Sequence, residues 1–420
     1  MDTHDREFLT RLFYAAVVAA DPKAAILPVL PKRPKGRTIV IGAGKGAAQM
    51  AAAFEDLWGE PVEGVVVTRY GYAAPTRHID VLVASHPVPD AAGLTATDAL
   101  YAAVQGLTAD DLVVALICGG GSALLPAPPK GLGLEDEQAL NEALLASGAP
   151  ISAMNAIRKQ VSRIKGGRLA AAAHPARVVS LVVSDVPGDD PAQVASGPTI
   201  PDAIGREEAL AYVAAHRIEM PESVRFYLES GVGEAPSPGD PLFARNEVHV
   251  IASAAISLEA AAVAAEAEGM SAVILSDAIE GEARVIGQMH AAIAREVRTR
   301  DRPFTAPIVI LSGGETAVTI GEPGGKGGRN TEFLLACAGG IKGLEVTAFA
   351  ADTDGIDGSE DNAGAFADGT TWARLRAGGN DPAALLGRHD AWTAFDALGD
   401  LFVPGPTGTN VNDFRALLIR

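Results

Sequence analysis

Runs of apolar residues that end directly in glycine-rich loops recur along this chain, and this pattern constrains the fold more than any other feature. Residues 38–41, 112–117 and 308–311 have the length and composition of buried strands, and glycines follow each of them. Strands that alternate with helical patterns predict an α/β protein. Open α/β sheets bind ligands beyond the carboxyl ends of their strands, so these loops are the expected functional positions.

The loop after the third run carries the most chemistry. Residues 312–315 read SGGE, and residues 324–330 read GGKGGRN before a helical pattern begins. Free N–H groups and the positive end of the helix dipole favour an anion at such a helix start. Arg329 can bind a carboxylate or phosphate through two parallel hydrogen bonds. An acid beside a phosphate usually implies a metal between them, which makes Glu315 a candidate ligand. The alternative is a flexible surface loop with incidental charge.

The loop after the first run fits two kinds of site. Gly42, Gly44 and Ala47 match the G-x-G-x-x-A form of dinucleotide-binding folds, whereas the G-x-x-x-x-G-K-[ST] spacing of a P-loop is absent. Arg69, at the end of the next strand, would suit NADP rather than NAD. This loop, with Lys45 inside it, therefore supports a dehydrogenase as well as a phosphate site.

The loop after the second run, residues 119–122, reads GGGS and is a good anion-binding nest. Ser122 is a poor candidate for a nucleophile because the G-x-S-x-G pattern is absent. His86 follows an expected strand at residues 81–84, where α/β sites are built, although a structural histidine fits equally well.

Two further stretches contribute candidates. Residues 152–173 have a helical pattern rich in basic residues, including Lys159, and they also carry Asn155; a solvated helix face is the alternative. Asp185 ends the expected strand at residues 178–183, where a general base or a metal ligand would be placed. Asp352 begins an acidic loop that either binds Mg²⁺ jointly or caps and turns the chain.

The overall composition narrows the class of protein. The 420 residues predict two or three domains, and the net charge of −18 argues against a nucleic-acid partner. Cys118 and Cys337 lie in apolar runs, which indicates buried reduced thiols. The N-terminus does not have a signal-peptide pattern, and no apolar run approaches the roughly 18 residues of a membrane span. These observations favour a cytoplasmic protein without a membrane partner.

Taken together, the loops hold basic groups that can bind phosphates, acids that can bind a metal ion, and N–H nests that can bind oxyanions. Two sheets facing each other would enclose a cleft lined by Lys45, Ser122, Asp185, Glu315 and Arg329. Phosphoryl transfer needs these parts, because positioning and charge stabilisation do most of the work. A hydride-transfer enzyme would use one dinucleotide loop and leave the second set of loops unexplained.

Nine motifs, which run from about residue 39 to residue 413, resemble those of the glycerate 2-kinase family. They are GAGKGAAQMA, SHPVPD, CGGGSALLPAP, NAIRKQVSRIKGGRLA, SDVPGDDPAQVASGPT, LSGGETAVTI, GGRNTEFLLA, AADTDGIDGSEDNAGAF and TGTNVND. The resemblance implies an N-terminal kinase domain at residues 1–240 with a Rossmann-like doubly wound sheet. It also implies a C-terminal MOFRL-type α/β domain at residues 241–420, with the active site in the cleft between the domains. The implied reaction transfers the γ-phosphoryl group of ATP to the 2-hydroxyl of D-glycerate and requires Mg²⁺.

The resemblance also implies roles for individual residues. Lys45 would neutralise phosphate charge, Asp185 would act as base on the glycerate hydroxyl, and Arg329 would hold the transferring phosphoryl group or the glycerate carboxylate. Glu315 would bind magnesium, with Asp352 behind it. The expected nucleotide-binding residues are Gly44, Gly46, Gly119, Gly120, Gly121 and Ser122. The expected substrate-binding residues are His86, Asn155, Lys159 and Asn330.

Two other functions remain open. An NADP-dependent hydroxypyruvate reductase fits the first glycine loop and Arg69, and a non-enzymatic nucleotide-binding or small-molecule-binding protein fits two α/β lobes. The sequence leaves the choice between a monomer and a homodimer open, as well as the metabolic pathway.

Overall fold

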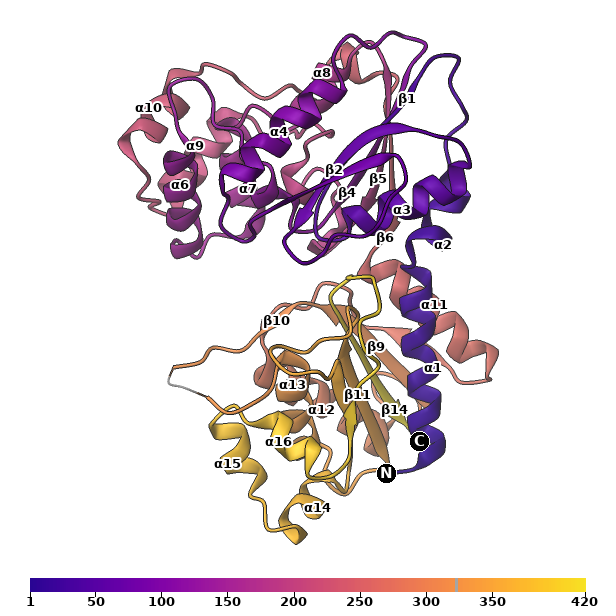
Figure 1. The fold of residues 1–420 in the computed structure, drawn as a ribbon. Coiled ribbons are helices and arrows are strands. Elements are labelled where there is room, and N and C mark those ends of the chain that lie inside the picture. The colour runs from indigo at the N-terminus through magenta and orange to yellow at the C-terminus, as the bar shows by residue number, and fades with distance from the viewer. Residues whose placement is uncertain (322–323) are drawn as a thin grey trace. The chain divides into compact units, whose positions relative to one another are not determined.

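The computed structural model of this chain describes residues 1–321 and 324–420, so residues 322 and 323 of the stretch before Arg329 lie outside it. The chain forms two compact units (Figure 1). The central unit comprises Pro22–Ile251, and the terminal unit joins Met1–Asp21 to Ala252–Arg420. Each unit contains a six-stranded sheet with helices, which confirms the predicted α/β class.

The units differ from the predicted domains, 1–240 and 241–420, at two places. Helix α1 (Thr3–Ala19) packs on α11 (Ala254–Ala267), and its buried Phe8 and Phe13 belong to the core of the terminal unit. Strand β6 (Glu247–Ala252) is the edge strand of the central sheet. The sequence pattern identifies the apolar face of a helix, but it does not identify the sheet which that face covers.

The sheet of the central unit has the strand order β3-β2-β1-β4-β5-β6, which is the order of Rossmann folds. Its first five strands are parallel. They are β1 (Thr38–Ala43), β2 (Glu63–Arg69), β3 (Ile79–Ala84), β4 (Leu112–Cys118) and β5 (Arg177–Val183). The Rossmann-like prediction is therefore confirmed, and the carboxyl ends of these strands lie along one edge of the sheet.

Side chains of the central strands alternate between two cores. Ile39 and Ile41 pack in the core that includes α4 (Ala91–Ala103) and α8 (Arg168–Ala173), whereas Val40 packs in the core that includes α3 (Ala47–Trp58). Figure 1 shows these helices around the sheet. The remaining helices near this sheet are α2 (Pro22–Ile26), α3 (Ala47–Trp58) and α5 (Gly121–Leu124). Apolar residues on both faces explain why the strands read as continuous apolar runs.

A helical lobe extends the central unit. Its helices are α6 (Leu134–Ala146), α7 (Ile151–Gln160), α9 (Arg206–Ala215) and α10 (Glu222–Ser230), and they share one apolar core. The helix predicted at residues 152–173 is two helices, because α7 ends at Gln160 and α8 begins at Arg168. Gly166 and Gly167 lie between them with φ of +64° and +82°, a conformation that a helix does not continue through.

The sheet of the terminal unit has the order β13-β12-β11-β14-β9-β7, and only its β7–β9 pair among the described pairs is parallel. The strands are β7 (Ala272–Ile274), β9 (Ile308–Gly314), β11 (Val346–Asp352), β12 (Gly364–Asp368), β13 (Leu401–Phe402) and β14 (Asp413–Ile419). The short strands β8 (Gly281–Glu282) and β10 (Thr316–Ala317) pair separately.

Helices cover both faces of this sheet (Figure 1). On β9, Ile308 and Ile310 join the core with α12 (Ala283–Arg300) and α13 (Arg329–Gly340), while Val309 and Leu311 join the core with α1 and α11. The smaller helices α14 (Thr371–Ala377), α15 (Pro382–Gly387) and α16 (Ala391–Asp396) lie near α13.

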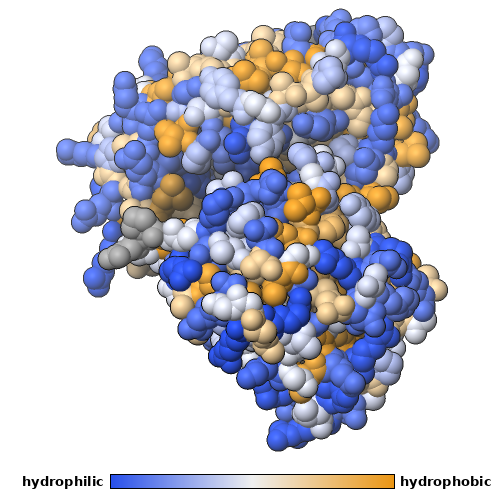
Figure 2. All heavy atoms as spheres, turned by 60° about the horizontal axis from the view of Figure 1, so that its bottom comes forward, coloured by the Kyte–Doolittle hydropathy of each residue, from blue (hydrophilic) through white to orange (hydrophobic). Residues whose placement is uncertain are grey.

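The surface and the cysteines complete the description. On the face drawn in Figure 2, hydrophilic residues are interspersed with separate hydrophobic patches. Among the described residues, no single helix has the length and apolar character to cross a membrane, and one bent pair, Thr3–Ala19 with Pro22–Val29, reaches them only when its two parts are counted together. Cys118 and Cys337 are buried free thiols, as predicted.

Candidate active site

The carboxyl ends of β1, β3, β4 and β5 bring several of the predicted site residues together in the central unit. The Lys45 loop (residues 44–46) follows β1, His86 follows β3, the Ser122 loop (residues 119–122) follows β4, and Asp185 follows β5. Parallel neighbouring strands end at the same edge of a sheet, which is why residues far apart in the sequence meet here.

The backbone of the Lys45 loop is fully engaged within the protein. The N–H groups of Gly44, Lys45 and Gly46 donate to Val67 O at 3.1 Å, Gly119 O at 2.8 Å and Cys118 Sγ at 3.2 Å. Gly44 has φ of +137°, and a Cβ atom on it would lie 2.4 Å from Cys118 Sγ. Gly44 is therefore required by the neighbouring strand β4, and the group that the loop offers to a ligand is the side chain of Lys45.

In the Ser122 loop, by contrast, two backbone N–H groups are not hydrogen-bonded to any described residue. Within residues 1–321 and 324–420, the N–H groups of Gly119 and Gly120 make no hydrogen bond. Gly120 has φ of +79°, in the left-handed region that glycine accepts without strain. Two adjacent N–H groups at a glycine turn form the kind of nest that binds an anion.

Three predicted side chains crowd against this turn. A Cβ atom on Gly119 would lie 1.9 Å from Oδ2 of Asp185, and one on Gly120 would lie 3.0 Å from Cγ of Lys45 and 3.2 Å from Nε2 of His86. Glycine is thus the residue that lets Lys45, His86 and Asp185 approach the backbone of the loop. The structure therefore brings together a cation, an imidazole, a carboxylate and two unused N–H groups.

The electrostatics of this cluster favour an anionic ligand. Burial, helped by the positive charges of Lys45 and Arg69, lowers the pKa of His86 to about 4, so its imidazole is neutral at pH 7. Burial raises the pKa of Cys118 to about 12, and the Asp185 charge adds to this while Lys45 opposes it. The Cys118 thiol next to the loop is therefore neutral and is not a nucleophile.

Ser122 is linked by hydrogen bonds to other residues of the central unit. Its Oγ lies 2.8 Å from Oγ of Ser196, and the Ser196 hydroxyl is 3.1 Å from Oδ1 of Asn155. Asn155 is buried and also donates from Nδ2 to Gln193 O at 3.1 Å. This chain places Asn155 in a supporting position, because both ends of its amide are bound by the protein.

Lys159 is fully enclosed, with 0% of its side chain exposed. Its ammonium group is paired with Asp202 and lies 3.4 Å from Oε1 of Gln193. Burial lowers the pKa of Lys159, and the charge of Asp202 opposes this shift. The structure thus places Lys159 in a buried ion pair, which its sequence pattern does not reveal, and its substrate contact stays a prediction.

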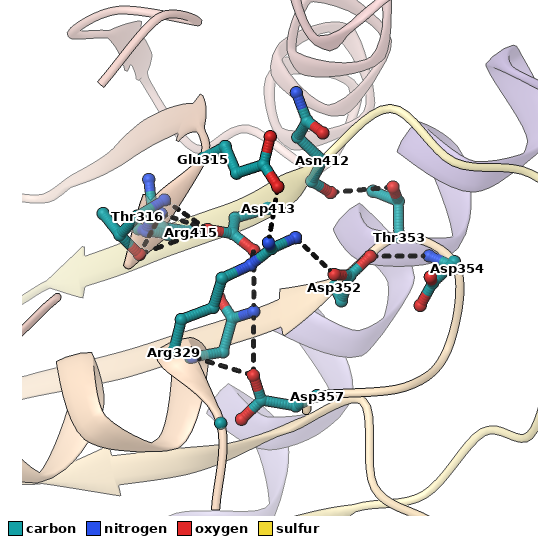
Figure 3. A network of polar contacts seen from close by, with 12 residues as sticks. Glu315, Thr316, Arg329, Asp352, Thr353, Asp354, Asp357, Asn412, Asp413 and Arg415 are labelled. Carbon is teal, nitrogen blue, oxygen red and sulfur yellow. Dashed lines mark hydrogen bonds and ion pairs between the residues drawn. The ribbon is translucent and has the colours of Figure 1, made fainter. Parts of the chain in front are cut away.

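The predicted residues of the terminal unit gather around Arg329 (Figure 3). Its Nε, Nη1 and Nη2 atoms donate to Asp413 at 2.7 Å, Glu315 at 2.8 Å and Asp352 at 2.6 Å. Burial alone would lower the pKa of Arg329, but the three carboxylates outweigh burial and raise it. Glu315 is the exposed partner, with 55% of its side chain accessible, against 7% for Asp352 and 0% for Asp413.

Asp413 is the residue that sequence reasoning missed. It accepts hydrogen bonds from Arg329 and from Nδ2 of Asn330 at 2.8 Å, and its other oxygen pairs with Arg415. Its signal in the sequence is its place between the TGTNVN loop and the final apolar strand. Asn330, predicted as a substrate residue, is completely buried by these contacts.

The anion predicted at the start of α13 is supplied by the protein itself. The carboxylate of Asp357 accepts from the N–H groups of Asn330 and Thr331, both at 2.9 Å, and from the Thr331 hydroxyl at 2.9 Å. A Cβ atom on Gly328 would lie 2.4 Å from Cγ of Asp357. The expectation of free N–H groups at this helix start is therefore wrong for Asn330 and Thr331, because an internal carboxylate caps them.

The predicted metal ligands are not arranged as a metal site. Glu315 and Asp352 both point to the guanidinium group of Arg329 (Figure 3). Among the described residues, no group of three or more His, Cys, Asp or Glu side chains is placed to hold a metal ion. Burial and the neighbouring acids Asp354 and Asp413 raise the pKa of Asp352, although Arg329 opposes them. The residues present thus fit a guanidinium better than a magnesium ion.

Comparison with known proteins places these features in a family context. Residues 8–229 match the family described as "Domain of unknown function (DUF4147)", and residues 308–413 match the MOFRL family. The chain is 52% identical to an Agrobacterium vitis protein named "Putative hydroxypyruvate reductase", over 100% of this chain and 95% of that one. It is 39% identical to a protein named "Glycerate 2-kinase" from Pyrococcus horikoshii, over 99% of this chain and 97% of that one. The crystal structure of glycerate kinase from Thermotoga maritima matches with a TM-score of 0.90 and 37% identity, over 100% of both chains.

Proposed function

Because this chain belongs to the glycerate kinase family, we propose that it transfers the γ-phosphoryl group of ATP to the 2-hydroxyl of D-glycerate, giving 2-phosphoglycerate and ADP. The observation that carries this proposal is the Ser122 loop, where Gly119 and Gly120 have unused N–H groups and lie against the side chains of Asp185 and Lys45. Phosphoryl transfer depends on such positioning and charge neutralisation.

In the proposed reaction, each of these groups has a distinct role. The Lys45 ammonium neutralises charge on the phosphoryl oxygens, and the N–H groups of Gly119 and Gly120 donate hydrogen bonds to them. The Asp185 carboxylate accepts the proton of the attacking 2-hydroxyl group. The hydroxyl oxygen forms the new bond to phosphorus while the bond from phosphorus to the oxygen of ADP breaks.

In the structure, the hydrogen-bond donors of Arg329 are already bound to three carboxylates of the protein. If it binds the transferring phosphoryl group or the substrate carboxylate, one of its three carboxylate partners must be exchanged. Glu315 is the partner that solvent reaches, whereas Asp352 and Asp413 are buried. The Mg²⁺ requirement stays a prediction of the family resemblance, and we assign it no ligand from this chain.

A reductase is the second candidate, favoured by the name of the Agrobacterium relative and by the Rossmann strand order. A dinucleotide fold presents loop N–H groups to the cofactor's pyrophosphate. Here the N–H groups of the Lys45 loop donate to Val67, Gly119 and Cys118. The guanidinium of Arg69, which would bind the 2′-phosphate of NADP, lies 4.3 Å from the centre of the Tyr72 ring. These contacts favour the kinase.

One comparison of two reactions tests the proposal. Purified protein is given ATP, Mg²⁺ and D-glycerate, and the product is assayed with enolase in the presence and absence of a phosphoglycerate mutase. A parallel sample receives NADPH and hydroxypyruvate. We expect ADP formation and a product that enolase uses without the mutase. NADPH oxidation without ADP formation would overturn the kinase, and ligand binding without either reaction would favour a binding protein.

A further inference from the structure

Arg158 on α7 is a partly buried cation whose hydrogen-bond partners are all neutral. Its Nε donates to Oδ1 of Asn141 on α6 at 2.8 Å, and its Nη1 donates to Oδ1 of Asn155 at 3.1 Å. Within the described part of the chain, Nη2 makes no hydrogen bond and no carboxylate forms an ion pair with Arg158. A desolvated guanidinium without a counterion is costly unless an anion joins it.

Two buried lysines of this region have a carboxylate partner, whereas Arg168 donates to the backbone carbonyl oxygens of Lys159 and Lys165. Lys159 is paired with Asp202, and Lys165 is paired with Glu137 at 2.8 Å; both lysines are almost completely buried. Burial lowers the pKa of Arg158, and the charge of Glu137 only partly opposes this shift. Glu137 is itself bound to Lys165 and to the N–H of Ala127. Among the described residues, Arg158 therefore differs from these two lysines in that no carboxylate pairs with it, and its neutral partners are side-chain amides.

Hydrogen bonds connect Arg158 to the Ser122 loop. Oδ1 of Asn155 accepts from both Arg158 and the hydroxyl of Ser196, which in turn contacts the hydroxyl of Ser122. Ser196 is fully buried with φ of +58°, and Ala195 beside it has φ of +53°. Such left-handed backbone costs free energy in a residue with a side chain and persists where its surroundings fix it. The position of the guanidinium is thus tied to the loop that carries the unused N–H groups.

From these observations we propose that Arg158 binds the carboxylate group of a short 2-hydroxy acid substrate. The planar guanidinium suits a carboxylate, because its donors match the two oxygens. This inference deepens the proposed function and rests on it: the phosphoryl group lies at the Ser122 loop, and Arg158 holds the charged end of the acceptor. The competing role is purely structural, in which Arg158 joins α6 to α7 through Asn141.

Four variants separate the two roles. Arg158→Gln removes the cation, and Arg158→Lys keeps the charge but loses the planar donor pair. Asn141→Ala removes the link between α6 and α7 while the cation stays. Arg163→Gln is the matched control, since Arg163 is an exposed arginine of the same segment whose Nε donates to Pro128 O at 3.0 Å.

Kinetics with D-glycerate and with its neutral amide, glyceramide, give the first readout. Arg158→Gln should raise KM for D-glycerate about 10- to 100-fold and leave KM for ATP unchanged, as expected for one charge-assisted hydrogen-bonding pair. The preference of the enzyme for D-glycerate over glyceramide should fall by the same factor. Arg158→Lys should lie between, and Arg163→Gln should match the wild type. An equal rise in Asn141→Ala, or an unchanged preference in Arg158→Gln, would overturn the proposal.

Binding without turnover gives the second readout. D-glycerate alone, without nucleotide, should raise the melting temperature of the wild type and of Arg163→Gln but not of Arg158→Gln. If the wild type binds D-glycerate but phosphorylates nothing, the proposed kinase fails while Arg158 is still tested by binding. If the wild type is an active kinase and Arg158→Gln binds D-glycerate normally, this inference alone fails. A wild type that neither binds nor phosphorylates D-glycerate overturns both.

Discussion

The two glycine-rich loops predicted to bind an anion differ in where the anion comes from. The loop of residues 324–330 leads into α13, whose first N–H groups are capped by Asp357, while Arg329 is held by three carboxylates. The Ser122 loop leads into α5 with two N–H groups unused and Lys45 close by. Glycines and basic residues therefore predict the geometry of an anion site, but they do not tell whether the protein fills that site itself.

The largest effect is expected next to the Ser122 loop, two of whose N–H groups are unused in the described structure. Lys45→Ala should lower kcat about 10²- to 10³-fold, because a preorganised charge at the transferring group is lost. Its melting temperature should stay near that of the wild type, since Lys45 is partly exposed and its backbone contacts remain. Steady-state kinetics and thermal unfolding measure the two quantities. A wild-type kcat at saturating ATP would remove Lys45 from the site.

In the loop of residues 324–330, the loss of the internal carboxylate should lower the stability of the fold rather than the rate of catalysis. Asp357→Ala leaves the buried N–H groups of Asn330 and Thr331 without their acceptor, which should cost about 2 kcal/mol of unfolding free energy, while the Thr331 hydroxyl can still donate to Gly328 O. Denaturant titration measures this cost, and Asp354→Ala, a change at a nearby acid of the same loop, serves as the control. If Asp357→Ala were as stable as the control, the cap would not be a structural element.

A smaller effect is expected from the exposed partner of Arg329. Glu315→Gln removes a charge from a surface ion pair, which should change the unfolding free energy by less than about 1 kcal/mol. Asp413→Asn acts on the buried side of the same guanidinium and should cost several times more, because Asp413 also neutralises Arg415. Equal costs in the two variants would contradict the view that Arg329 has one exchangeable and two fixed partners.

The sequence predicted the surroundings of the Ser122 loop better than those of the loop of residues 324–330, and the reason is physical. Lys45, His86 and Asp185 follow the ends of parallel strands, and the apolar runs that reveal those strands are continuous because both sheet faces are buried. Asp357 contacts Asn330 from 27 residues away, Asp413 contacts Arg329 from 84 residues away at the start of β14, and no local pattern encodes such contacts. Strand β12 reads GAFAD, and the sequence does not predict it because its small residues carry little apolar signal. Lys159 is enclosed and paired with Asp202, whereas its neighbour Arg158 is only partly buried, and the helical pattern of the sequence does not show this difference.

The smallest expected effect is the pH dependence of stability that His86 and Asp357, one beside each loop, contribute. The folded pKa of His86 is about 4, below the usual 6.5, so its neutral form stabilises the fold fully above pH 6.5, and this contribution is lost as pH falls through 4. The folded pKa of Asp357 is about 6, above the usual 3.8, mainly because it is buried. Its contribution has the opposite sign: it is complete below pH 3.8 and is lost as pH rises through 6.

Nuclear magnetic resonance titration of the His86 ring tests directly whether the Ser122 loop is free to bind phosphate. The signal is the one that disappears in His86→Gln, and its midpoint should lie near pH 4 in the free protein. Lys45→Ala should raise this midpoint, because the Lys45 charge helps to lower the pKa, but burial should keep it below 6.5. ATP should also raise it, since phosphate bound at the Ser122 loop offsets the charge of Lys45. A midpoint that ATP does not move would mean that the phosphates bind elsewhere, and the loop would then be open without being the nucleotide site.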